Sequence, residues 1–185
     1  MIILIIGVVL VFNVKFDISG VDKLCDKLKK DLQSVKGARA GYINRKQYPN
    51  GLDVAKNALI QEYGTTIHVT DKMRKWFAAQ GYPLKKTTTE IIIPPRPFLR
   101  KSLKAQKQWV KYVNEMFDAN QDGHMTLLQI AKNIAEMIKD AIQESIGSNI
   151  APSNSDMTIA RKKSSSTLID TGLLRSSVQS GVIKK

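Results

Sequence analysis

The chain has 185 residues and a formal net charge of +13, from 29 Lys and Arg against 16 Asp and Glu. Its hydrophobic content of 43% excludes a fully disordered chain, and its length fits one domain. One cysteine, Cys25, excludes a disulfide scaffold and any zinc site that needs two thiolates. The charge indicates a polyanionic ligand, an acidic partner or a surface buried among subunits.

The N-terminal residues 1–12 form an uncharged apolar run. A membrane-spanning helix needs about 20 such residues, and a signal peptide needs basic residues before the run and a cleavage site after it. We therefore expect no membrane association and interpret residues 1–13 as an apolar extension or strand. The single domain is predicted over residues 14–182, and it starts with the strand-like alternation of Val14, Phe16 and Ile18.

The first third of this domain shows alternating helix and strand signals. Apolar residues at helical spacing predict a helix over residues 19–35, for which Gly37 is the expected stop. Residues 38–44 are small and apolar and are interpreted as a strand. The Pro-Asn-Gly sequence within residues 48–51 predicts a turn.

The next segment is predicted to contain an insertion at about residues 66–89. A helix over residues 52–63, ended by Gly64, precedes it. A strand over residues 90–93 follows it, and the prolines after Ile93 end that strand. Within the insertion, residues 71–80 fit a short basic helix that carries two aromatic side chains.

The last part of the chain is predicted to be mainly helical. Helices are expected over residues 98–117 and 126–145, separated by a polar break. Gly, Pro, Asn and Ser residues predict a mobile loop over residues 147–167. The predicted class is α+β, with a small, mainly antiparallel sheet of three or four strands packed against several amphipathic helices.

The polar break contains a partial calcium-binding pattern. Asp118, Asn120 and Asp122 occupy positions 1, 3 and 5 of an EF-hand loop, and Gly123 occupies position 6. Position 12 is Gln129, so the bidentate carboxylate of that motif is missing. The alternative is a polar turn in which Asp118 or Asp122 caps the next helix. We expect no bound metal and no cofactor, with calcium as a weak candidate.

Two further patterns are candidates for chemistry. The Asp170-Thr-Gly172 triplet matches that of aspartic proteases. Those enzymes need two carboxylates that share a proton, hence a second triplet or a symmetric dimer, and a mostly β framework, whereas this chain has one triplet and is predicted to be rich in helix. We therefore predict no catalytic site and no enzyme activity. A basic set could contact phosphates or an acidic subunit, or could form an ordinary solvated face; it comprises Arg161, Lys162, Lys163 and Arg175.

Several short motifs occur in a recognisable order. They are Tyr48-Pro-Asn-Gly51, Glu62-Tyr-Gly-Thr65, Ile93-Pro-Pro-Arg-Pro-Phe-Leu-Arg100, Thr158-Ile-Ala-Arg-Lys162 and Leu168-Ile-Asp-Thr-Gly-Leu-Leu-Arg-Ser-Ser177. Together they resemble the tail-completion, neck or head–tail joining proteins of tailed bacteriophages. The resemblance covers about residues 14–182, and the chain departs from it in residues 1–12 and in the basic insertion.

The resemblance implies a structural virion protein with an α+β fold and no catalytic role. Such a subunit is expected to form a ring between the head and the tail, for which a hexamer is one option. Implied partners are other head–tail connector, tail-terminator or tail-tube proteins, with non-specific contact to packaged DNA. The expected location is the neck or head-proximal tail of the virion, and the host cytoplasm during assembly. The alternative is a basic DNA-binding protein without catalytic activity.

The resemblance also indicates which residues carry the motifs and the assembly role. They are Glu62, Gly64, Pro94, Pro95, Arg96, Pro97, Phe98, Asp170, Thr171, Gly172 and Leu173. In that light the prolines stiffen a link between a strand and a helix, and Arg96 could pair with a carboxylate of its own chain or of a neighbour. Asp170 and Thr171 could cap a C-terminal helix whose leucines pack inward.

Overall fold

The computed structural model of the chain describes residues 35–104, 106–121 and 123–184. The apolar segment 1–13, the strand and helix expected over residues 14–34, Cys25 and Asp122 lie outside the described residues. The α+β class is confirmed. The four described strands are all antiparallel, and they form two separate sheets of two strands each.

The first sheet joins the start and the end of the described chain. β1 (Val35–Gly41) pairs antiparallel with β4 (Gln179–Lys184), in a register that matches Ala38 to Val182 and Gly41 to Gln179. Ala38 and Ala40 are buried, and these small side chains let α6 pack closely on the sheet. Gly37, expected to end a helix, is instead a buried residue of β1, because its neighbours pair with β4.

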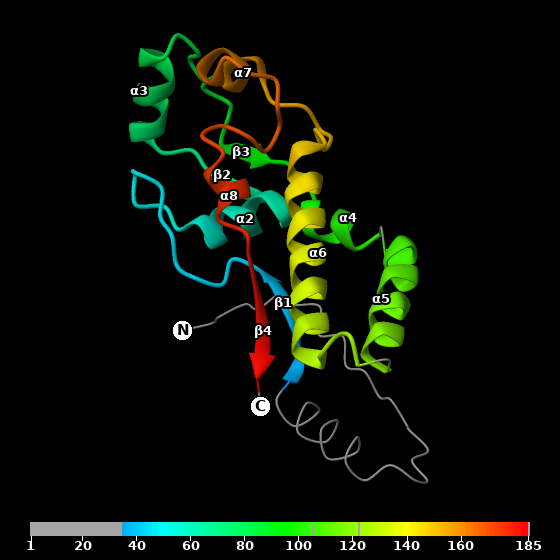
Figure 1. Cartoon of the computed structure of the whole chain (residues 1–185). Helices are drawn as coiled ribbons and strands as arrows, with labels where there is room; N and C mark the ends of the chain where they lie inside the picture. Colours follow the sequence, from blue (N-terminus) through cyan, green and yellow to red (C-terminus); the bar gives the residue numbers. More distant parts are fainter. Residues whose placement is uncertain (1–34, 105, 122, 185) are drawn as a thin grey trace.

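The central element is the long helix α6 (Leu127–Gly147), which runs alongside the β1–β4 sheet (Figure 1). Thr126 begins it with a capping box: the Thr126 hydroxyl accepts from the Gln129 backbone N–H, and the Gln129 side-chain oxygen accepts from the Thr126 backbone N–H. The helical spacing predicted this element well. Its buried face consists of Ile130, Ala131, Ile134, Ala135, Ile138, Ile142, Ser145 and Ile146.

Two helices precede α6 where the sequence predicted one. The short helix α4 (Phe98–Leu103) packs on α6, and α5 (Gln106–Gln121) follows it on the other side of α6 from the β1–β4 sheet (Figure 1). Apolar spacing does not detect the interruption after Leu103, because both helices present an apolar face to the same partner. α5 also extends four residues beyond the predicted Phe117.

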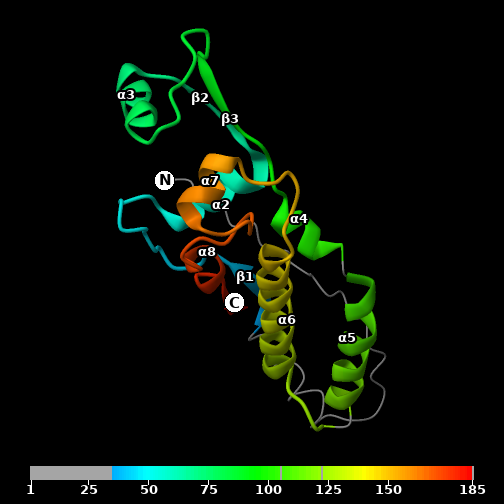
Figure 2. The ribbon, with the colours of Figure 1, turned by 90° about the horizontal axis from the view of Figure 1, so that it is seen from above.

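Residues 65–93 form an arm that projects away from the rest of the molecule (Figure 2). The arm consists of the paired strands β2 (Thr65–His68) and β3 (Glu90–Ile93) and the helix α3 (Asp71–Ala79) between them. The Arg74 guanidinium ties α3 to the return segment through a 2.9 Å hydrogen bond to the carbonyl of Lys85. The insertion predicted at about residues 66–89 is therefore an ordered supersecondary unit.

Three further helices belong to the described part of the chain. α2 (Val54–Tyr63) confirms the helix predicted over residues 52–63. Asp53 is its N-cap, and the Asp53 carboxylate accepts hydrogen bonds from two backbone N–H groups of the first turn. α7 (Asp156–Lys162) lies inside the segment predicted as a loop, so that prediction is wrong for these residues: Ser155 caps the helix despite the flanking Pro and Ser residues. α8 (Leu173–Ser176) precedes β4.

Candidate functional site

The motif residues around Glu62 and Pro94 meet at one place, which we call the junction: residues 61–64 at the end of α2 and residues 94–100 at the start of α4. The backbone N–H of Arg96 donates to the carbonyl of Gln61 at 2.6 Å. Gly64 has φ +74°, and a Cβ there would lie 2.7 Å from the Ile93 carbonyl oxygen and 2.9 Å from the Pro95 nitrogen. Only glycine fits this close approach of two backbones.

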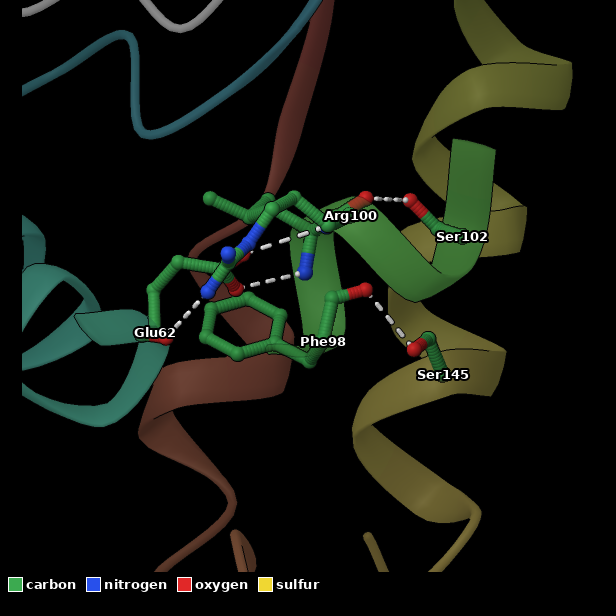
Figure 3. Close-up of polar contacts among 6 residues, drawn as sticks. Glu62, Phe98, Arg100, Ser102 and Ser145 are labelled. Atoms are coloured by element: carbon green, nitrogen blue, oxygen red, sulfur yellow. Dashed lines mark hydrogen bonds and ion pairs between the residues drawn. The ribbon is translucent and has the colours of Figure 1, made fainter. Parts of the chain in front are cut away.

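Glu62 holds the start of α4 through its side chain (Figure 3). Its carboxylate is 1% exposed and accepts hydrogen bonds from the backbone N–H groups of Leu99 at 2.8 Å and Arg100 at 3.2 Å. The Arg100 Nε donates to the same carboxylate at 2.9 Å. Pro97 begins α4 without a side-chain cap, so Glu62 takes over the role of satisfying the free N–H groups of the first turn.

Phe98 links the junction to the central helix. Its ring is completely buried, and its carbonyl accepts a 2.7 Å hydrogen bond from Ser145 Oγ on α6 (Figure 3). One turn later, Ser102 Oγ donates to the Leu99 carbonyl at 2.7 Å. The end of α2, the proline segment and α6 are thereby fixed to one another by buried polar contacts.

Arg96 is 5% exposed and points into the loop before α7. Its guanidinium donates to the carbonyls of Pro152 at 2.9 Å and Ser153 at 3.2 Å, and also to the amide oxygens of Gln61 and Asn154. These partners are neutral, which differs from the carboxylate expected from the sequence. Burial lowers the pKa of Arg96, in keeping with a cation that has lost water without meeting an anion.

A cleft of about 670 Å³ opens between the arm, α2, α7 and α8. One side is apolar and is formed by Trp76 and Phe77 of α3 with the isoleucines of β3. The other side carries Arg161 and Lys162 of α7. The remaining predicted site residues on its lining are Pro94, Arg96, Asp170, Thr171, Gly172 and Leu173.

The electrostatics of the cleft are dominated by cations. Lys162 donates to the Ser166 carbonyl at 2.7 Å. Burial lowers the pKa of Lys162; the nearby carboxylate of Asp170 opposes this effect, while Arg96 and Arg161 add to it by repulsion. Burial likewise raises the pKa of Tyr48 at the edge of the cleft. Burial thus disfavours charge of either sign at the two groups, and the repulsion between Lys162, Arg96 and Arg161 shows that three cations lie near one another at the cleft.

The C-terminal motif contributes to this cleft in a different way from that expected. Gly172, at φ +77°, is the N-cap of α8, and no side chain caps that helix. Thr171 Oγ1 accepts a 3.3 Å bond from the Leu173 N–H, whereas Asp170 is exposed. Leu174 is buried and Leu173 is partly buried, so the expected inward packing is confirmed.

Two basic residues and the candidate calcium-binding residues lie outside the cleft. Lys163 and Arg175 are exposed and do not line it. Asp118 and Asn120 lie within α5, where the backbone is helical, and the Gln129 side chain is engaged in the capping box of α6. The connection to α6 is capped by Thr126, so the expectation that Asp118 caps that helix is wrong, and Asp122 lies outside the described residues.

Sequence reasoning missed several residues that build the junction and the cleft. Gln61 and Asn154 hold Arg96, and Ser145 holds Phe98. No local pattern marks them, because each acts on a segment far away in the chain. The aromatic pair of α3 was visible in the sequence, but its position facing α7 depends on the path of the arm.

Comparisons with known protein families, with curated proteins and with solved structures found no significant match. In the described residues, no three His, Cys, Asp or Glu side chains gather in a group that could hold a metal ion. None of the helices in the same part of the chain is long and apolar enough to cross a membrane.

Proposed function

We infer that the chain is a structural subunit of a tailed-bacteriophage virion, acting in tail completion or as a neck subunit that forms a ring between head and tail. The observation that carries this proposal is the junction. Two motifs of the phage resemblance, Glu62-Tyr-Gly and Pro94-Pro-Arg-Pro-Phe98, meet there in direct backbone contact. Their residues serve to fix elements relative to one another, which is the use expected in a subunit without catalytic machinery.

The arm supports an assembly role for this subunit. The close contact at Gly64 fixes where the arm leaves the body. The arm then presents apolar side chains to solvent, with Ile92 71% exposed and Tyr82 42%. Exposed apolar groups on a projecting element are typical of a surface that another subunit covers. In this proposal the arm contacts the neighbouring copy within the ring.

The proposal places the ring in the neck or head-proximal tail, next to connector, tail-terminator or tail-tube proteins. The charge of +13 suits that setting, because DNA passes through the lumen of such a ring and is attracted to basic surfaces without sequence recognition. The subunit would assemble in the host cytoplasm before it enters the virion.

Oligomeric state tests the proposal. We expect the purified chain to form a closed ring in native mass spectrometry and negative-stain images, and to be detected in purified virions. Ile92→Glu is expected to break the ring, because it places a charge on the exposed apolar face of the arm. Gln121→Glu adds the same charge at the exposed end of α5 and serves as the control. A monomeric chain that is absent from virions refutes the proposal.

A basic DNA-binding protein is the second candidate, favoured by the exposed Arg161 of α7 and the exposed Lys163 that follows this helix. In that case duplex DNA should bind with an affinity that falls steeply with salt. Neutralising these two residues together with Lys162 should abolish the binding. Such binding by a chain that forms no ring would favour this candidate over the virion subunit.

A further inference from the structure

The cleft between the arm and α7 carries an excess of positive charge that the described residues do not balance. Arg96, Arg161 and Lys162 line it, and Asp170 is the one carboxylate on its lining. Within the described part of the chain, none of the three cations forms an ion pair with a carboxylate. Arg161 is exposed and Lys162 is partly buried, so an anion from outside the chain can reach these two cations and pair with them.

The part of the lining that the arm contributes is apolar, and the cleft has the dimensions of a binding site. Trp76 and Phe77 meet edge to face with their ring centroids 5.0 Å apart, and Ile91 and Ile93 continue the wall along β3. The volume of about 670 Å³ lies within the range of about 300–1,000 Å³ that is usual for specific ligand sites. The aromatic wall belongs to the insertion, so it is a feature of this chain that the phage resemblance does not supply.

We propose that this cleft binds an acidic peptide segment of a partner protein, with an apolar side chain against the aromatic wall and a carboxylate facing Arg161 and Lys162. An extended peptide presents alternate side chains to opposite sides, which suits a cleft with one apolar and one cationic wall. This inference rests on the lining of the cleft and is independent of the proposed ring.

The charge of the molecule and the apolar lining of the cleft disfavour two other occupants, a second copy of this chain and nucleic acid. The cations of the cleft require an acidic segment, and a second copy of this chain, with 29 Lys and Arg against 16 Asp and Glu, is a poor source of one. Nucleic acid would satisfy Arg161 and Lys162, but a duplex leaves the isoleucines of β3 without an apolar partner. An acidic peptide matches both walls at once.

Trp76 provides a direct probe of binding at this place. The chain has two tryptophans, and Trp109 lies on α5, packed against the core and away from the cleft. In the Trp109→Phe variant, fluorescence therefore reports on Trp76 alone. The probe is an acetylated peptide of alternating glutamate and leucine, compared with the same peptide carrying glutamine or lysine in place of glutamate. Duplex and single-stranded oligonucleotides form the nucleic-acid arm.

We expect the glutamate peptide to change the Trp76 fluorescence saturably. The affinity should fall as salt rises from about 0.1 M to about 1 M, because the Debye length shrinks from about 10 Å to about 3 Å. The glutamine and lysine peptides should bind more weakly. The paired variant Arg161→Gln/Lys162→Gln should weaken binding about tenfold, and Asp170→Asn should tighten it about two- to fivefold by removing the repelling carboxylate.

Lys56→Gln/Lys132→Gln removes two exposed cations that do not line the cleft and is the matched control. Its affinity should stay within about twofold of the parent. Equal weakening by both double variants would show a general attraction to the basic surface and would overturn the proposal. The same conclusion follows if no saturable change occurs with the glutamate peptide, or if only the oligonucleotides change the Trp76 signal.

Discussion

Replacing Glu62 by alanine tests the central contact of the junction. The change leaves the buried N–H of Leu99 without an acceptor, which costs about 1–3 kcal/mol, and removes a charge-assisted bond of similar size from Arg100. The Arg100 side chain is 57% exposed, so water replaces most of its ion pair, and that loss adds at most about 1 kcal/mol. We expect the free energy of unfolding to fall by about 3 kcal/mol. Glu62→Gln retains one acceptor oxygen and should cost about half as much.

Urea unfolding followed by far-ultraviolet circular dichroism measures this difference, at one fixed protomer concentration because assembly also contributes to stability. Glu144→Ala removes an exposed carboxylate from α6 and should change the free energy of unfolding by less than about 0.5 kcal/mol. If Glu62→Ala is as stable as Glu144→Ala, the carboxylate does not hold the start of α4, and the description of the junction is wrong.

Three further predictions concern stability in the same assay. Gly64→Ala should cost more than about 2 kcal/mol, because it combines a positive φ with a backbone collision, whereas Gly51→Ala, with open space around its Cβ, should cost about 1 kcal/mol. Ser145→Ala should cost about 1–2 kcal/mol by removing the buried hydrogen bond to the Phe98 carbonyl, and no loss would contradict the tie between α4 and α6. Burial raises the pKa of Tyr42 above its value in an unfolded chain, about 10. The neutral phenol therefore stabilises the fold below that pH, and this part of the free energy of unfolding is lost as the pH rises above it. Tyr42→Phe should reduce the fall in the free energy of unfolding at alkaline pH, and an unchanged dependence on pH would contradict the prediction.

The predictable part of the fold is the part that local sequence controls. α6 follows from apolar residues at helical spacing and from the capping residue Thr126. The helix that ends at Gly64, the turn at Gly51 and the strand over residues 90–93 also follow from glycine and proline positions. Each of these signals acts within a few residues, so the tertiary structure leaves it unchanged.

The rest of the fold depends on contacts between distant segments. Gly37 ends no helix, because the segment around it pairs with β4. The helix α7 forms in a stretch rich in loop residues, because Ser155 caps it and the Arg96 guanidinium fixes the preceding loop. The sequence indicated that Glu62 and Arg96 belong to motifs, but it could not indicate that one accepts from α4 and the other donates to residues 152–154.

The pairing of β1 with β4 has a consequence for synthesis of the chain. The register joins Val35 to Lys184, a separation of 184 − 35 = 149 residues. At about 5–20 residues per second, β1 waits roughly 7–30 s for its partner strand to be made. α6 ends at Gly147, so for the last 184 − 147 = 37 residues of that interval, about 2–7 s, its apolar face lacks one of the two strands that later cover it. Newly made chains therefore expose this face until residues 179–184 have been made and have paired with β1.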